Sequence, residues 1–182
     1  MPLPLQPPRM ELRDFRAEDF AAVHAYASDP LVTRWTSWGP NSEAETRAFL
    51  DAVVGEPAEQ PRTSYSLAII DRATGTLFGG CGLYLRRGLY REYEMGYVLH
   101  RDWWGRGLAS EAARALLAFG FGELRAHRIY AQVDPENEAS GRVVARLGFR
   151  LEGHIRKDML KHGVWRDSLV FGFLEEEWRP EG

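Results

Sequence analysis

The sequence predicts one mixed α/β domain, in which strands and helices follow one another in the order β-α-α-β-β-β-α-β-α-β-β. Short runs of alternating apolar residues are interleaved with runs whose apolar residues recur every three or four positions. A glycine-containing segment at residues 104–109 separates a strand-like run from an alanine-rich helical run. A length of 182 residues and a hydrophobic content of 45% suit a single buried core.

The first third of the chain predicts a strand followed by two helices. Residues 10–15 alternate well enough for a short strand, and residues 16–28 carry apolar residues at helical spacing. Ser42 followed by Glu45 is a capping-box pattern, so a second helix is expected to start there and to continue to about residue 54.

The middle of the chain predicts three strands that pair as an antiparallel meander. Their segments are 64–70, 77–85 and 92–100. Residues 71–75 have the turn-forming composition that joins the first two strands. The alanine-rich helix that follows leads to a strand at 128–133, which completes a β-α-β unit.

The last third of the chain predicts one short helix and two strands. Asn137 can cap this helix, and Gly148 stands where a left-handed residue is expected to end it. The strands are expected over residues 150–159 and 165–174, with a turn near residue 163 between them.

The charge and the N-terminal sequence argue against several classes of protein. A net charge of −3 gives no general attraction to nucleic acid or to an anionic membrane, so neither is expected as a partner. Residues 1–9 contain no apolar targeting segment and are expected to form a flexible lead-in to a single domain at 10–182. No apolar run approaches the roughly 18 residues of a membrane span.

The only cysteine, Cys81, excludes an intrachain disulfide and fits a reducing compartment, so a cytoplasmic location is expected. Its glycine-rich, apolar surroundings predict a packed and unreactive thiol and not a nucleophile. The five histidines show no metal-ligand spacing with one another or with Cys81, so no metal site is expected.

The segment Trp-Gly-Arg-Gly-Leu-Ala at residues 104–109 stands at the expected start of a helix. Such a turn offers unpaired amides and the positive end of the helix dipole to a phosphate, and side chains at 105 or 107 would hold that ligand away. The segment lacks the Gly-Lys-Ser/Thr of NTPases, and Ser110 replaces the third glycine of a dinucleotide fingerprint. Two glycines alone fit an ordinary turn without a ligand better, so the surrounding motifs must decide.

Four motifs in sequence order resemble the GCN5-related N-acetyltransferase (GNAT) superfamily. They are residues 93–100, residues 104–112, residues 137–140 with Gly148-Phe149, and residues 163–167. The residues of these motifs are similar to those of the ribosomal-protein-alanine N-acetyltransferases, the RimJ/RimL-like branch. The resemblance covers roughly residues 10–178. It implies a twisted, mixed and mostly antiparallel sheet of about seven strands, flanked by about four helices.

The resemblance implies acetyl-CoA as the donor cosubstrate. Main-chain groups of Tyr97, Val98 and Leu99 are expected to pair with its pantetheine arm, and Asn137 to contact the same arm. The pyrophosphate is expected on the turn formed by Trp104, Gly105, Arg106, Gly107, Leu108 and Ala109. The side chains of Arg106, Arg142 and Arg146 can reach coenzyme phosphates, although solvated helix charges explain them equally well. Asp102 stands where the superfamily prefers Gln or Arg, which puts a side-chain contribution there in doubt.

Acetyl transfer to an amine requires a proton acceptor, stabilisation of an oxyanion and a proton for the leaving sulfur. By resemblance, Glu94 is the candidate base, acting directly or through water, and a structural ion pair is its alternative role. Ser140 is the candidate proton donor to the sulfur, and satisfying the start of its helix is its alternative role.

The sequence therefore predicts an acetyl-CoA-dependent N-acetyltransferase that acts on a primary amine by direct attack on the thioester. The acceptor is either a protein N-terminal α-amino group or a small-molecule amine, and fold-level kinship does not choose between them. Two alternatives stay open, a non-catalytic acyl-CoA-binding regulatory module and a transferase for a larger acyl group such as succinyl. A homodimer is possible, since dimers are common among the resembling proteins.

Overall fold

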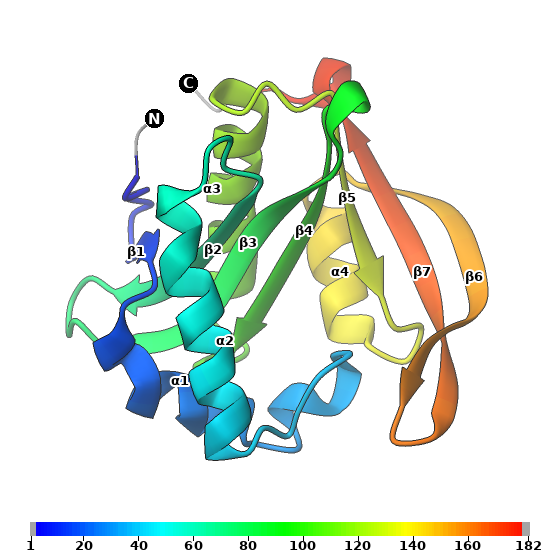
Figure 1. Ribbon diagram of the computed structural model, residues 1–182. Helices are drawn as coiled ribbons and strands as arrows, with labels where there is room; N and C mark the ends of the chain where they lie inside the picture. The colour runs from blue at the N-terminus through cyan, green and yellow to red at the C-terminus, as the bar shows by residue number, and fades with distance from the viewer. Residues whose placement is uncertain (1–2, 180–182) are drawn as a thin grey trace.

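The computed structural model describes residues 3–179, and the observed elements follow the predicted order (Figure 1). The strands are β1 (Met10–Asp14), β2 (Ser64–Asp71), β3 (Leu77–Arg87), β4 (Glu92–Leu99), β5 (Arg128–Val133), β6 (Arg150–Lys161) and β7 (Val164–Leu174). The main helices are α1 (Phe20–Ala27), α2 (Glu43–Gly55), α3 (Leu108–Gly122) and α4 (Glu138–Arg146). The predicted mixed α/β fold class is confirmed.

The seven strands form one sheet in the order β1-β2-β3-β4-β5-β7-β6. All neighbours are antiparallel except β4 and β5, which run parallel because α3 crosses between them. These two strands pair only from Glu92 opposite Arg128 to Glu94 opposite Tyr130. Beyond that point they diverge, as Figure 1 shows, so residues 95–99 of β4 pair with β3 alone. We call this divergence the split.

Helix ends form where the sequence places capping residues. The amide of Ser42 donates to Glu45 Oε2 at 2.7 Å, and the amide of Glu45 donates to Ser42 Oγ at 3.3 Å, which completes the predicted capping box of α2. Asn137 caps α4 with its side-chain oxygen, and Gly148 follows that helix with a φ of 97°. These local signals position α4 at the split.

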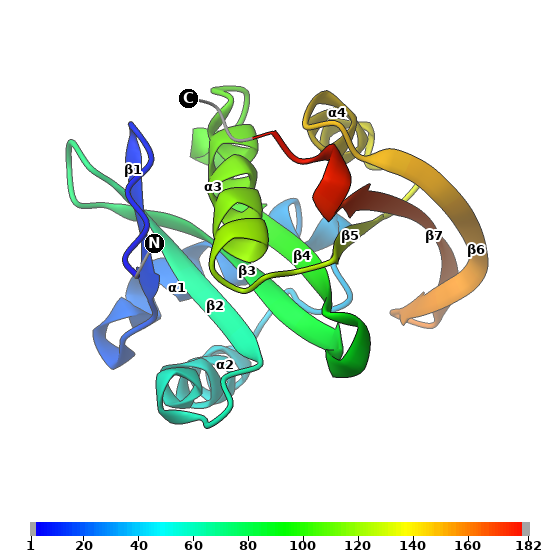
Figure 2. The ribbon, with the colours of Figure 1, turned by 90° about the horizontal axis from the view of Figure 1, so that it is seen from above.

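The helices cover both faces of the sheet, with α3 and α4 on one side and α1 and α2 on the other (Figure 2). The larger core lies under α3, where Leu116 and Leu117 are fully buried against strand residues such as Ile129. The smaller core lies under α1 and α2 and includes Val23 and Leu50. Burying each of these side chains contributes about 1.5–3 kcal/mol, which fixes both helical layers against the sheet.

The N-terminal segment differs from the expected flexible lead-in. Residues 1–2 lie outside the described part of the chain, but Leu5 is only 1% exposed and exchanges backbone hydrogen bonds with Leu12 at 2.8 and 2.9 Å. Farther along, the Arg9 side chain forms a 2.6 Å ion pair with Glu111 of α3. A proline-rich segment with isolated leucines carries no periodic signal, so these long-range contacts were not predicted.

Cys81 is buried within β3, which confirms the predicted packed thiol. Burial raises the pKa of this thiol, in the direction that the predicted low reactivity requires. Between residues 3 and 179, no helix is both long and apolar enough to span a bilayer. The same residues contain no cluster of three or more His, Cys, Asp or Glu side chains arranged to hold a metal ion.

Candidate active site

The turn that precedes α3 has the backbone shape that its glycines predict. Gly105 and Gly107 both have a φ of 74°, in the left-handed region that favours glycine. A Cβ atom added at Gly105 would meet no atom within 4 Å, and one added at Gly107 would meet a guanidinium nitrogen of Arg9 at 3.7 Å. Gly107 is the N-cap of α3 and has no side chain to cap it. The first amides of α3 are therefore able to donate to an anion.

The arginines predicted for coenzyme phosphates occupy different places. Arg106 folds back on the turn, donating to the carbonyl of Asp102 at 2.7 Å and lying 5.2 Å from the ring centre of Trp103. Arg146 is exposed in the last turn of α4, at the opposite end of that helix from Asn137. Arg9, whose contact with this turn was not predicted, donates to the Arg106 carbonyl at 3.0 Å. Arg9 is thus a second cation beside the turn.

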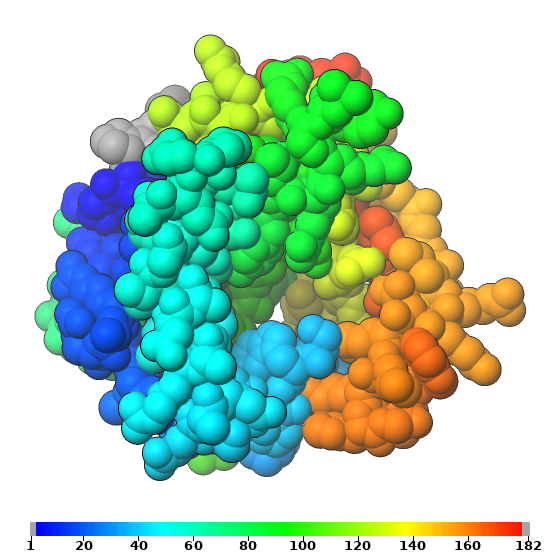
Figure 3. Space-filling model, in the orientation of Figure 1, coloured from blue at the N-terminus to red at the C-terminus, as the bar shows by residue number. Residues whose placement is uncertain are grey.

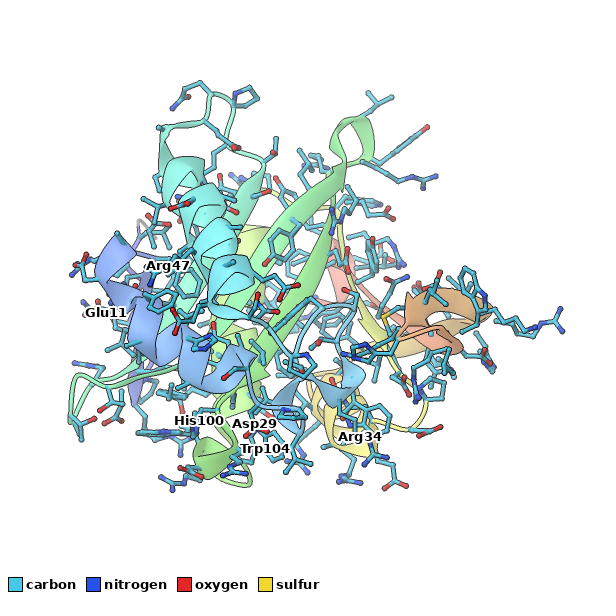
Figure 4. All side chains as sticks on the ribbon, turned by 60° about the horizontal axis from the view of Figure 1, so that its bottom comes forward. Glu11, Asp29, Arg34, Arg47, His100 and Trp104 are labelled. Atoms are coloured by element: carbon cyan, nitrogen blue, oxygen red, sulfur yellow. The ribbon has the colours of Figure 1, made fainter. Side chains whose placement is uncertain are left out.

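The residues predicted to pair with pantetheine lie in the half of β4 that pairs with β3 but not with β5. Tyr97 and Val98 contribute to the two different cores, because successive side chains of a strand point to opposite faces. The Leu99 carbonyl accepts a hydrogen bond from Trp104 Nε1 at 2.9 Å, so this group is already used. Figure 4 shows Trp104 and His100 near this end of β4. Along residues 95–99 no residue of β5 pairs with β4, so this edge of the strand carries no sheet partner.

Glu94 is the last residue of β4 that pairs with β5. Arg86 Nε donates to Glu94 Oε2 at 2.7 Å, and the hydroxyl of Tyr130 lies 3.5 Å from the same oxygen. The alternative role as an ion-pair carboxylate is therefore observed, while 24% exposure of the side chain still admits water. Arg86 was not predicted. It lies at a register shift of β3, two residues after Tyr84, which is the cross-strand partner of Glu94.

Ser140 meets β4 across the split. Its side-chain oxygen lies 2.8 Å from the hydroxyl of Tyr97. Burial raises the pKa of Tyr97 to about 12, so this phenol is protonated at neutral pH. The amide of Ser140 donates to Asn137 Oδ1 at 3.1 Å. Asn137 therefore caps α4, and the Ser140 hydroxyl is directed to β4 and not to the helix start.

The hollow at the split is visible in Figure 3, between the green central strands and the orange hairpin of β6 and β7. A short 3₁₀ helix, η2 (Val32–Trp35), belongs to the blue segment along its lower side. The ammonium of Lys161 donates to the carbonyls of Thr36 at 2.7 Å and Trp38 at 2.9 Å, and also to that of Thr33. These bonds tie the hairpin to the η2 segment, so the hollow has a lower wall.

The two candidate catalytic side chains approach the split from opposite faces of the sheet. Glu94 and Val98 are four residues apart in β4, so their side chains point to the same face of the sheet. Val98 packs on the side of α1 and α2. Tyr97, which holds Ser140, packs with the core under α3. The split therefore has a proton acceptor on one face of the sheet and a hydroxyl donor on the other. This arrangement suits a reaction in which a nucleophile loses a proton while a leaving group gains one.

Comparisons with known proteins agree with this geometry. The family model described as an acetyltransferase (GNAT) domain matches residues 9–150. An uncharacterized N-acetyltransferase of Bacillus subtilis (strain 168), YnaD, is 36% identical over 170 residues, which are 93% of this chain and 96% of that protein. The ribosomal protein uS5-alanine N-acetyltransferase of Escherichia coli (strain K12) is 35% identical over 94 residues, 52% of this chain and 48% of that protein.

A solved structure extends the likeness to three dimensions. Mycobacterium smegmatis RimJ, in complex with CoA-disulfide, superposes with a TM-score of 0.82 at 27% identity, covering 96% of this chain and 87% of that chain. The family match spans most of the sequence, and the glycine turn and the split lie within or beside it. The chain belongs to the GNAT acetyltransferase family and is an N-acetyltransferase with relatives in the RimJ/RimL-like branch.

Proposed function

We propose that this enzyme transfers the acetyl group of acetyl-CoA to a primary amine, either a protein N-terminal α-amino group or a small-molecule amine. The split is the observation that carries the proposal, since it opens one edge of β4 between the helix start at Gly107 and the hydroxyl of Ser140. A pyrophosphate on the amides of α3 would direct an attached pantetheine arm along that edge. The coenzyme bound by the related RimJ protein supports this assignment.

In the proposed reaction the amine nitrogen attacks the thioester carbon as the neutral base. A C–N bond forms, the C–S bond breaks, and the sulfur leaves with the bonding electron pair. Glu94 accepts a proton from the amine through water, and Ser140 donates one to the sulfur. A main-chain amide near Val98 polarises the thioester carbonyl. An α-amino group, with a pKa of about 7.7–8.0 against about 10.4 for lysine, needs the mildest assistance.

The donor and the acceptor are tested together in one screen. Acetyl-CoA and succinyl-CoA are each incubated with the enzyme and with a panel of amines that includes peptides with varied first residues. We expect thiol release and a mass increase of one acetyl group on at least one amine class. Peptide acceptors are supported by the activity named for the Escherichia coli relative.

The outcomes of this screen separate the alternatives. Transfer from succinyl-CoA in preference to acetyl-CoA would show that the donor is succinyl-CoA and not the proposed acetyl-CoA. Coenzyme binding without transfer to any amine would contradict the proposed activity and would favour a regulatory coenzyme-binding module.

A further inference from the structure

The hydroxyls of Tyr97 and Ser140 form the contact that joins β4 to α4 at the split, with 2.8 Å between their oxygens. This separation is the normal length of an O–H···O hydrogen bond. The phenol oxygen also lies 3.5 Å from the backbone carbonyl of Ser140, at the limit of hydrogen bonding. The phenol has one hydrogen, so it must choose between the serine oxygen and the carbonyl.

The distances favour donation from Tyr97 to Ser140 Oγ. If the serine hydroxyl were the donor, the phenol hydrogen would be left with the carbonyl at 3.5 Å, a much weaker partner. A phenol is also more acidic than an alkyl alcohol and is therefore the better donor. With Tyr97 donating, the hydrogen of Ser140 is free to point to another acceptor.

The start of α4 does not compete for the Ser140 hydroxyl. Asn137 Oδ1 already accepts from the Ser140 amide at 3.1 Å, which is the N-cap bond of the helix. The helix also fixes the Ser140 backbone, so the phenol determines only the direction of the hydroxyl. A serine whose oxygen accepts one hydrogen bond releases its own proton more readily, since that bond stabilises the developing negative charge.

We infer that Tyr97 is a positioning residue of the transfer reaction, whose phenol orients Ser140 so that the serine hydrogen faces the leaving sulfur. The inference rests on the proposed function. As the C–S bond breaks, the sulfur takes the electron pair and the Ser140 proton, and Tyr97 stabilises the serine oxygen until water returns a proton to it. Tyr97 itself neither gains nor loses a proton overall.

The test is a double-mutant cycle with Tyr97→Phe, Ser140→Ala and the double variant, assayed with the amine that the acceptor screen identifies. Tyr97→Phe removes one hydrogen bond to a developing charge and should therefore lower kcat about tenfold, which corresponds to about 1.4 kcal/mol. The KM for acetyl-CoA should stay within about twofold, because the phenol ring is retained. In the Ser140→Ala background the same change should have no effect on kcat.

Tyr93→Phe is the matched control. Tyr93 lies on the same face of β4 and in the same core, and no hydrogen bond joins it to α4 among the described residues. It should keep wild-type kcat, and thermal denaturation should show that both Phe variants are folded.

Three results would overturn the inference while the enzyme remains active: an unchanged kcat in Tyr97→Phe, an equal loss in Tyr93→Phe, or an equal loss with and without Ser140. A wild-type protein that transfers no acyl group would instead overturn the proposed function, and this inference with it.

Discussion

The two halves of the sheet differ in how completely they are paired and buried. In the closed half, β3 and β4 pair from Gly79 opposite Leu99 to Arg87 opposite Glu92, beneath helices on both faces. In the open half, β5 meets β4 through three residue pairs, and the outermost strand, β6, exposes apolar side chains such as Leu151 and Leu160. The closed half therefore supplies the structural frame, while the candidate catalytic residues gather where the pairing of β4 with β5 stops.

The frame is tested by removing a core side chain from it. Leu116 of α3 is fully buried, and Leu116→Ala should lower the free energy of unfolding by about 2–5 kcal/mol, because it deletes apolar contacts and leaves a cavity. Leu160→Ala in β6, where the side chain is 52% exposed, should cost less than about 0.5 kcal/mol. Urea denaturation measures both changes in the free energy of unfolding. Equal losses in the two variants would contradict the difference in burial between the two halves.

The chemistry of the open edge is tested at Glu94. Glu94→Gln keeps the size of the side chain but removes the proton acceptor, so kcat should fall about 100-fold while coenzyme affinity changes little. Glu92→Gln is the control, since Glu92 lies on the same face of β4 in an ion pair with Arg128 and has no proposed role. Kinetics of Glu94→Gln that match the wild type at every pH would remove Glu94 from the mechanism.

A smaller effect on stability is expected from the ion pair of Asp19 and Arg13, which lies in the closed half and has no proposed role in the reaction. Burial acts to raise the pKa of Asp19, but hydrogen bonds from Arg13 and from the Arg16 amide outweigh it, so the pKa is lowered. The stability gained is present above the unfolded pKa of about 3.9 and is lost as the pH falls through the lower folded pKa. Asp19→Asn should cost about 1–2 kcal/mol at pH 7 and progressively less below pH 4.

Unfolding at pH 7 and pH 3 checks this prediction. The exposed Asp51 in α2 provides the control, since Asp51→Asn should leave the pH dependence of unfolding at its wild-type course. A gap between wild type and Asp19→Asn that stays constant from pH 7 to pH 3 would show that Asp19 contributes no charge-dependent stability.

The features that the sequence predicted well depend on neighbouring residues. The capping pair Ser42 and Glu45, the cap Asn137 and the left-handed Gly148 all act within one turn of their own position. Hydrophobic periodicity, together with capping and turn residues, placed the strands and main helices, because each of these signals follows from local backbone geometry.

The features that were missed join residues far apart in the chain. Tyr97 and Ser140 are 43 residues apart, and Arg9 and Glu111 are 102 apart, so neither contact leaves a local pattern. The position of the split could not be predicted from the sequence either. The strand-like pattern of β4 continues to Leu99, although its pairing with β5 ends at Glu94. Only the tertiary arrangement determines where two parallel strands separate.

The proposed function depends on the turn at Gly107 holding the coenzyme through its main chain. Calorimetric titration of CoA into wild type, Gly107→Val and Gly163→Val tests it, because Gly163 in the β6–β7 turn has a similar φ of 78° but lies outside the proposed coenzyme site. Both substitutions force a side chain into a left-handed conformation and should cost about 1–2 kcal/mol of stability. We expect Gly107→Val to weaken CoA binding at least about 100-fold, or about 2.7 kcal/mol, and Gly163→Val to bind CoA as the wild type does. Unchanged CoA affinity in a folded Gly107→Val variant would contradict this role of the turn.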